Sequence, residues 1–155
     1  MTVQKQDPIV RSEMLIRKPV EQVFEAFIDP DITRNFWFTR GSGRVEEGKY
    51  IVWEWEMYGV SDEIYVEEVL AHERIRILST DGTRMEWHFT ARSAQETFVS
   101  IEHYGFTGTS DELLTICVDS MGGFTMVLCG LKAFLEHNIV LNLVADKAPD
   151  AHVNQ

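Results

Sequence analysis

The chain has 155 residues, of which 45% are hydrophobic and 25% charged, and its formal net charge is -11. A chain of this length and composition can bury a core of its own without disulfides or metals to hold it. The net negative charge disfavours nucleic acids and anionic membrane surfaces as partners, because proteins bind both through clustered Lys and Arg.

The N-terminal region predicts one strand followed by two short helices. Hydrophobic and polar residues alternate over Ile9 to Arg17, which indicates a strand with one buried face. Within 20–27 the apolar residues recur at i, i+3, i+4 and i+7, the spacing of one helical stripe. Asp29-Pro30-Asp31 breaks this helix and caps a further turn that carries Trp37 inward.

The middle of the chain, 41–106, predicts six antiparallel strands that follow one another as a meander. Its hydrophobic residues recur with a period of two between turns rich in Gly, Asp and Ser. Glu67-Glu68 interrupts this alternation and indicates a β-bulge. Two segments have one apolar, aromatic face, made by Ile51, Trp53, Trp55 and Met57 within 50–57 and by Met85, Trp87 and Phe89 within 83–91.

A long helix is predicted after the last strand. Thr109 and Glu112 have the spacing of a capping box at its start, and Asn138 suits its end. Gly122-Gly123 would weaken such a helix by about 2 kcal/mol, so we expect a kink there or a close approach of the sheet. The predicted buried stripe consists of Cys117, Met121, Phe124, Leu128, Leu131 and Leu135.

The order of these elements resembles the α+β helix-grip fold of the START-related superfamily (SRPBCC, polyketide cyclase/dehydrase-like). In that fold a curved antiparallel sheet wraps around a long C-terminal helix. Several short motifs narrow the resemblance, namely Pro19 to Phe27, Asp29-Pro30, Trp37, Gly43, Glu47-Gly48, Val66 to Val69, His103-Tyr104-Gly105-Phe106, Gly122-Gly123-Phe124, Leu128, Leu131 and Leu135. From about Ile9 to Asn138 they resemble the C-terminal domain of the heat shock protein 90 ATPase activator. Phe124 departs from this pattern, because the family often carries Trp there.

The resemblance implies a stand-alone family member, because no residues remain here for the N-terminal domain of the eukaryotic activator. It implies neither a ligand nor a catalytic residue set, since such members share no agreed one. We expect a single helix-grip domain over 1–155, with its core in 9–138 and a polar tail from about 145 to 155.

The sequence favours a cytoplasmic protein without a metal or cofactor. It shows no signal peptide, and no stretch is expected to reach the roughly 20 apolar residues of a membrane span. Cys117 and Cys129 would lie about 18 Å apart on one helix, whereas a disulfide needs Cα atoms within about 7 Å. The five histidines show no paired metal-binding spacing such as H-E-x-x-H.

The acidic segment from Glu46 to Glu73 holds nine acids and one Lys. We interpret it as a solvated outer face of the sheet, which keeps the protein soluble. The alternative is a docking patch for a basic protein partner. The sequence leaves open whether the protein is a monomer or a homodimer.

An apolar pocket is predicted between the sheet and the C-terminal helix. Its predicted wall consists of Trp53, Trp55, Met57, Trp87 and Phe89 on the sheet and Met121, Phe124 and Leu128 on the helix. His103 is the polar candidate, and its inward position would keep the imidazole neutral. The alternative is that these large side chains simply fill the core.

The first hypothesis for function is therefore the binding of a small hydrophobic or aromatic ligand without covalent chemistry. The second is an enzyme of the aromatic cyclase or dehydratase type, in which His103 moves protons. The third is a chaperone-associated module that docks a partner on its acidic face. A nucleophilic serine is disfavoured, because Ser120 lies outside any G-x-S-x-G motif. Catalysis is thus less favoured than binding.

Overall fold

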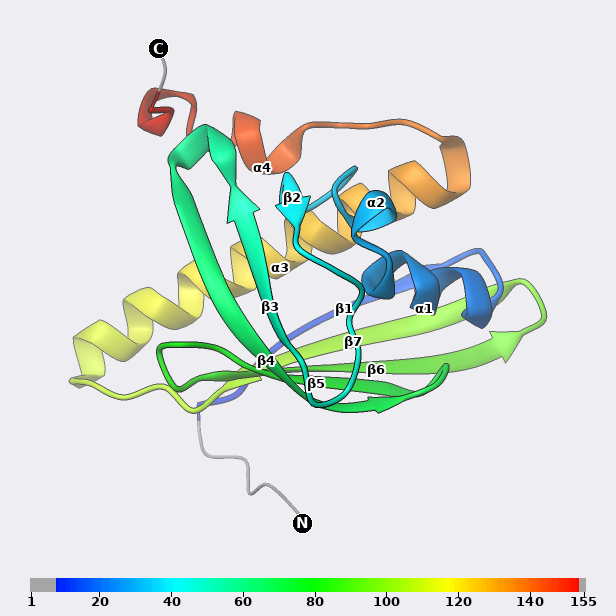
Figure 1. Cartoon of the computed structure of the whole chain (residues 1–155), viewed down its shortest axis with the longest axis horizontal. Helices are drawn as coiled ribbons and strands as arrows, with labels where there is room; N and C mark the ends of the chain where they lie inside the picture. Colours follow the sequence, from blue (N-terminus) through cyan, green and yellow to red (C-terminus); the bar gives the residue numbers. More distant parts are fainter. Residues whose placement is uncertain (1–7, 154–155) are drawn as a thin grey trace.

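The computed structural model describes residues 8–153, which form one curved antiparallel sheet with a long helix lying across it (Figure 1). The strands are β1 (Val10–Ile16), β2 (Arg40–Gly41), β3 (Tyr50–Trp55), β4 (Val60–Leu70), β5 (Arg74–Leu78), β6 (Arg84–Ser93) and β7 (Glu96–Tyr104). The helices are α1 (Val20–Ile28), α2 (Pro30–Thr33), α3 (Ser110–His137) and α4 (Leu143–Asp146), with 3-10 turns η1 (Glu56–Tyr58) and η2 (Pro149–Ala151). The predicted α+β helix-grip fold is confirmed.

The sheet has the strand order β1-β7-β6-β5-β4-β3-β2. The chain therefore runs through β2 to β7 as a meander, and β1 closes the sheet by pairing with the last strand. The predicted bulge is confirmed, because the register of β4 against β5 shifts between Val66 and Glu68. Such a bulge bends the strand and helps the sheet to curve around the helix.

The two short N-terminal helices cover one end of the inner sheet face. Phe27 of α1 packs against Trp87 and Phe89, with ring centroids 5.7 and 6.0 Å apart. The Asp29 carboxylate accepts a hydrogen bond from the backbone N–H of Asp31, so this aspartate caps α2 as predicted. The chain that leaves α2 then brings Trp37 against the core.

Helix α3 runs without interruption over 28 residues. The Thr109 hydroxyl accepts from the backbone N–H of Glu112 at its start, and Asn138 ends it in the left-handed conformation with φ 54°. The fully buried positions all lie in its second half; they are Phe124, Val127, Leu128, Gly130 and Leu131. The first half is mostly exposed, as at Leu114 and Val118.

The buried stripe of α3 includes Phe124, Leu128 and Leu131 as predicted, and it adds Val127 and Gly130. Met121 is 42% exposed, and its sulfur lies at the border of the helix against the Ser12 hydroxyl. Ser120, Phe124 and Val127 recur at i, i+4 and i+7 and therefore share one face. Met121 was predicted to be buried against the sheet; it contacts Ser12 of β1 but stays partly exposed, and Ser120 points toward the pocket beside it.

The two glycines of α3 do not mark a close approach of the sheet. A Cβ atom added at Gly123 would meet no heavy atom within 4 Å, and at Gly122 only the Lys147 ammonium at 4.0 Å. The close approach is at Gly130, where an added Cβ would lie 3.0 Å from the Cβ of Phe36. The predicted explanation for Gly122-Gly123 is therefore wrong, and Gly123 borders open space instead.

Helix α3 is also long and apolar enough to cross a membrane by length and composition, with a mean hydropathy of 1.6 over its most apolar stretch. The expectation that no stretch reaches this composition is wrong, because Gly122, Gly123 and their small neighbours extend the run without adding charge. Core helices of soluble proteins pass the same test. Within the described residues, 22% of this stretch is buried, and Leu128 and Leu131 are 0% exposed.

We expect Leu128→Ala to lower the free energy of unfolding by about 2 to 5 kcal/mol, because it removes buried atoms and leaves a cavity. Leu114→Ala is the matched control on the same helix, and we expect a change within about 0.5 kcal/mol because Leu114 is 66% exposed. Urea denaturation measures both values. Equal, small losses in the two variants would contradict the packing of α3 on the sheet.

Candidate functional site

A pocket of about 210 Å³ lies along α3, beside the middle of the helix. Its lining residues are Trp37, His103, Ser120, Gly123, Phe124, Met126, Val127 and Val144. Five of these belong to α3, whereas His103 comes from β7, Trp37 from the chain after α2 and Val144 from α4. The lining is apolar except for His103 and Ser120, so the pocket has one polar corner.

Gly123 is the residue that keeps this space open. It lies between Ser120 and Phe124 on the side of α3 that borders the pocket, and it has no side chain to project into it. Trp37 also lines the space and packs edge-on against Phe124, with ring centroids 5.8 Å apart. A glycine in the middle of a helix lowers helix stability relative to alanine. At position 123 the missing side chain leaves part of the pocket unfilled.

The C-terminal segment, 139–153, folds back over this region and contributes Val144 to the pocket (Figure 1). Tyr58 of η1 holds the segment by donating to the backbone carbonyls of Val144 and Ala145. The backbone N–H of Val153 donates to the carbonyl of Met57 at 2.9 Å. Residues 145–153 of the predicted polar tail therefore pack against η1, while 154–155 lie outside the described residues.

His103 and Ser120 form the polar corner. The Nδ1 atom of His103 lies 2.7 Å from the Ser120 hydroxyl, and the imidazole packs edge-on against Phe106 and Phe124. The alternation of β7 predicts that His103 points inward with Val99 and Ile101, and the structure places it there. A strand of the sheet and the helix thus each contribute one polar group.

The polar corner is connected to the protein surface by two more residues. The Nε2 atom of His103 lies 3.0 Å from the Thr83 hydroxyl, and that hydroxyl donates to the Asp81 carboxylate at 2.6 Å. Thr83 is buried, whereas Asp81 is exposed in the turn before β6. We call Asp81, Thr83, His103 and Ser120 the polar relay.

Burial lowers the pKa of His103 from 6.5 to about 4, and the Asp81 carboxylate acts weakly in the opposite direction. Desolvation disfavours the imidazolium, because an apolar surround cannot replace its hydration. His103 is therefore neutral at pH 7. A neutral imidazole donates from one ring nitrogen and accepts at the other.

This arrangement suits hydrogen bonding better than nucleophilic catalysis. An imidazole of such low basicity is a weak general base for a serine hydroxyl. Ser120 also lies in the interior of α3, where backbone N–H groups are engaged in the helix and none is free to stabilise an oxyanion. The relay thus provides a hydrogen-bonding position at the pocket wall.

The structure divides the predicted pocket wall between the pocket and the core. His103 and Phe124 line the pocket. Four others, Trp53, Trp87, Phe89 and Leu128, lie in the packed core. The indole N–H groups of Trp53 and Trp87 have no hydrogen-bond partner among the described residues, and the space beside them is too small for a water molecule.

The remaining predicted wall residues lie elsewhere. Trp55 is partly buried at the edge of the core, and Met121 is at the outer border of α3. Met57 was assigned to a strand, but it lies in η1, because the chain turns at Glu56 and Gly59 has φ 61°. Met57 borders a smaller groove of about 80 Å³, which shares Trp37 and Val144 with the pocket.

Sequence reasoning missed six of the eight pocket residues, namely Trp37, Ser120, Gly123, Met126, Val127 and Val144. A signal for Ser120 was present, because Ser120, Phe124 and Val127 have helical-stripe spacing with one polar member. The open space at Gly123 and the return of Val144 over the helix have no signal in the sequence.

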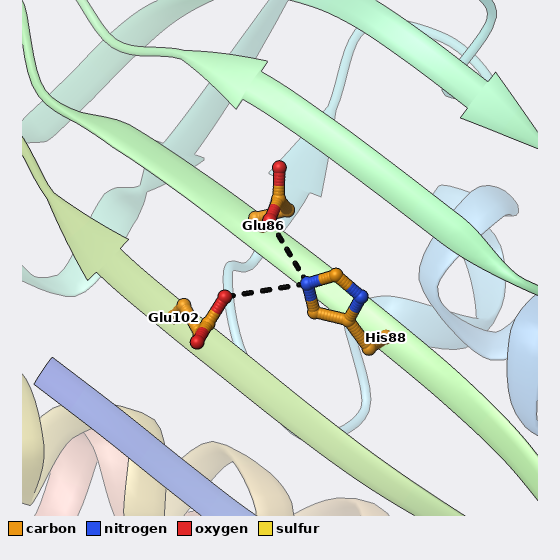
Figure 2. Close-up of side chains that lie close together, drawn as sticks. All are labelled: Glu86, His88 and Glu102. Carbon is orange, nitrogen blue, oxygen red and sulfur yellow. Dashed lines mark hydrogen bonds and ion pairs between the residues drawn. The ribbon is translucent and has the colours of Figure 1, made fainter. Parts of the chain in front are cut away.

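A second polar cluster lies on the outer face of the sheet, away from the pocket. Figure 2 shows Glu86 and His88 of β6 and Glu102 of β7 pointing toward one another. Glu86 and Glu102 are paired across the strands and are 4% and 5% exposed. The His88 Nε2 atom lies 2.9 Å from the nearer Glu86 oxygen and 3.3 Å from that of Glu102.

These three side chains could offer one nitrogen and two oxygens to a divalent metal ion. Their charges are already balanced, however, because Arg11 donates to Glu102 and Arg76 lies 3.8 Å from Glu86. We therefore interpret the cluster as a buried ion network in which His88 separates two carboxylates. The spacing of the histidines in the sequence does not predict this cluster, because it combines one histidine with two glutamates and its members come from two neighbouring strands.

Two glutamates of the acidic segment Glu46 to Glu73 lie on the same outer face of the sheet and are paired there with arginines. Glu67 accepts hydrogen bonds from Arg84 and Arg76, and Glu68 accepts from Arg74. The Arg74 guanidinium holds the pKa of Glu68 below its usual value. Part of the predicted acidic patch is thus engaged within the sheet and is not available to a partner.

Comparison with protein families gives a match over residues 17–136, to the family described as activator of Hsp90 ATPase homolog 1-like protein. The matched range begins just before α1 and ends within the last turn of α3, so it includes most of the pocket lining. Among curated proteins, no relative matches the chain.

Several solved structures are similar to this one. Protein SSP2350 from Staphylococcus saprophyticus has a TM-score of 0.77 and 28% sequence identity, over 86% of this chain and 95% of that chain. The Aha1 dimer from Colwellia psychrerythraea has a TM-score of 0.71 and 18% identity, over 83% and 96%. CalU16 from Micromonospora echinospora has a TM-score of 0.66 and 16% identity, over 95% and 93%. The last two similarities concern the fold alone.

We expect acid to destabilise the protein through His103. The unfolded state binds a proton near pH 6.5 and the folded state only near pH 4, so the free energy of unfolding falls as pH drops through this range, by about 2 to 3 kcal/mol. His103→Asn should flatten the dependence between these two pH values. Denaturation at both pH values measures the difference, and an NMR titration midpoint of His103 near 6.5 would contradict it.

We expect His88→Ala to cost about 1 to 3 kcal/mol of stability, because it takes from two buried carboxylates the imidazole that lies between them. Thr90→Ala is the matched control, since Thr90 is exposed on the same face of β6. Thermal and urea denaturation measure both. A loss at His88 no larger than at Thr90 would show that the network does not stabilise the sheet.

Proposed function

This chain belongs to the family of activator of Hsp90 ATPase homolog 1-like proteins, and from that premise we propose that it binds a small, neutral, mostly apolar molecule in the pocket beside α3. The observation that carries the proposal is the unfilled space at Gly123, which apolar side chains and one polar corner surround. Concave, mostly apolar sites with a few convergent polar groups are typical of small-molecule binding.

The size of the pocket limits the ligand. About 210 Å³ is below the roughly 300 to 1,000 Å³ that is usual for drug-sized ligands. A compact molecule of one to three rings matches this space better than a long lipid does. The Trp37 and Phe124 rings, 5.8 Å apart, favour an aromatic or planar ligand by ring packing.

The charge of the pocket also limits the ligand. No lining residue is charged at pH 7, since burial keeps His103 neutral. An ionised ligand group would lose its hydration there without gaining an opposite charge, which is costly. The ligand is therefore uncharged.

The two alternative functions have weaker support. A cyclase or dehydratase would need a proton donor and acceptor near neutral pH, and the low pKa of His103 does not suit that role. Docking of a basic partner on the acidic face competes with the Arg side chains already paired to Glu67 and Glu68. Ligand binding remains the best-supported function, in a protein that we expect in the cytoplasm.

A homodimer is compatible with this function. The similar Colwellia psychrerythraea structure is a dimer. In this chain Leu114, Val118 and Met121 form an exposed apolar stripe on α3, at spacings of four and three residues. This stripe faces away from the pocket, so a second copy bound there would leave the pocket accessible.

We expect Gly123→Leu to weaken binding of the neutral fluorescent probe N-phenyl-1-naphthylamine at least tenfold, because the new side chain occupies the pocket. The protein should still fold, since nothing lies within 4 Å of the added Cβ. Fluorescence titration with the wild-type protein should first show saturable binding.

Gly122→Leu is the matched control. It makes the same change one residue earlier on α3, where the added Cβ approaches only the mobile end of the Lys147 side chain. Both variants gain similar helix propensity, so only the filled pocket separates them. Equal probe affinities in the two variants would refute binding at Gly123, and no saturable binding by the wild type would refute the function itself.

A further inference from the structure

We infer that the pocket recognises its ligand by a hydrogen-bond donor. The ligand group at Ser120 is an O–H or N–H, as in a phenol or an alcohol, and is not a carbonyl or ether oxygen. This inference rests on the proposed ligand-binding function and specifies the chemical class of the ligand. It follows from the direction of each hydrogen bond in the polar relay.

The direction is set at Asp81. The Asp81 and Thr83 side-chain oxygens lie 2.6 Å apart, and two oxygens at this distance need a hydrogen between them. A carboxylate only accepts, so the hydrogen is that of the Thr83 hydroxyl. The backbone N–H of Thr83 also donates to the same carboxylate oxygen, at 2.9 Å. The Thr83 hydroxyl has no second hydrogen and must accept from its other neighbour.

That neighbour is the Nε2 atom of His103, 3.0 Å away. Because the Thr83 oxygen accepts, Nε2 carries the hydrogen. The imidazole is neutral at pH 7, so its single ring hydrogen is on Nε2 and Nδ1 has none. The exposed carboxylate thereby selects one tautomer of a buried histidine through a hydroxyl group.

The last link is Ser120. With no hydrogen on Nδ1, the Ser120 hydroxyl donates to it across 2.7 Å. Its only hydrogen is then engaged, and its oxygen presents unused lone pairs at the pocket wall. A ligand donor would extend the chain of hydrogen bonds, and aligned bonds of this kind polarise one another.

A ligand group that can only accept hydrogen bonds is disfavoured at Ser120. A carbonyl or ether oxygen at Ser120 would face lone pairs, unless Ser120 turned its hydrogen away from His103. That turn would leave the buried Nδ1 atom without a partner, and a buried acceptor without a partner is unfavourable. A difference of about tenfold in affinity between matched donor and acceptor ligands corresponds to about 1.4 kcal/mol, the net scale of one hydrogen bond.

The first experiment needs no ligand. Nitrogen-15 NMR of the imidazole rings distinguishes the two tautomers, and we expect His103 with its hydrogen on Nε2 at pH 7. Thr83→Val keeps the shape but removes the hydroxyl that selects this tautomer, so we expect a mixture of tautomers in that variant. A wild-type hydrogen on Nδ1 would overturn the inference.

The second experiment compares three ligands of one shape class by displacement of N-phenyl-1-naphthylamine. They are naphthalene, 1-naphthol, which adds a donor, and 1-methoxynaphthalene, which offers only an acceptor. We expect 1-naphthol to bind about tenfold more tightly than 1-methoxynaphthalene, and naphthalene to bind no more weakly than the ether. Equal affinities for the naphthol and the ether would overturn the inference.

Two variants test whether the preference for 1-naphthol over its methyl ether comes from the polar relay. Ser120→Val removes the hydroxyl and covers Nδ1 with a methyl group, so the naphthol-to-ether ratio should fall below about threefold. Thr125→Val makes the same kind of change at an exposed position of α3 and should leave the ratio unchanged. A ratio kept by Ser120→Val would overturn the role of Ser120. If naphthalene binds and no preference appears, only the inference fails; if the probe itself shows no saturable binding to the wild type, the proposed function fails with it.

Discussion

The structure depends on how α3 packs against the rest of the fold, which is tight at one glycine and loose at another. At Gly130 the helix lies so close to Phe36 that an added Cβ would be only 3.0 Å from the Cβ of that residue. This contact and the burial of Leu128 and Leu131 hold the second half of the helix in place. About two turns away, a Cβ added at Gly123 would meet no heavy atom within 4 Å, and the pocket occupies that gap.

The polar relay explains how an apolar pocket acquires a defined polarity without containing a charge. Asp81 is exposed to water, so its charge carries little desolvation cost. Its effect on the pocket passes through Thr83 and His103, which each have only one possible arrangement of hydrogens once the carboxylate is ionised. A charge placed directly in the pocket would select ions, whereas the relay allows selection among neutral molecules.

The two faces of the sheet have different roles. The inner face is filled with aromatic and branched side chains, so little space remains there except beside α3. The outer face pairs acidic and basic side chains, such as Glu67 with Arg84 and Glu102 with Arg11. The pocket proposed for small molecules thus lies along one side of the helix.

The sequence by itself determined the order of elements, the capping of α2 and α3, the β4 bulge and the inward position of His103, because these follow from local periodicity and turn chemistry. Only the tertiary structure decided which aromatic residues fill the core and which line a pocket. Trp53 and Phe124 are similar in sequence terms and both belong to the buried core, but only Phe124 also borders the gap at Gly123. The partnership of Ser120, His103, Thr83 and Asp81 has the same origin. Residues from a helix, two strand ends and a turn come within hydrogen-bonding distance only when the helix lies on the sheet.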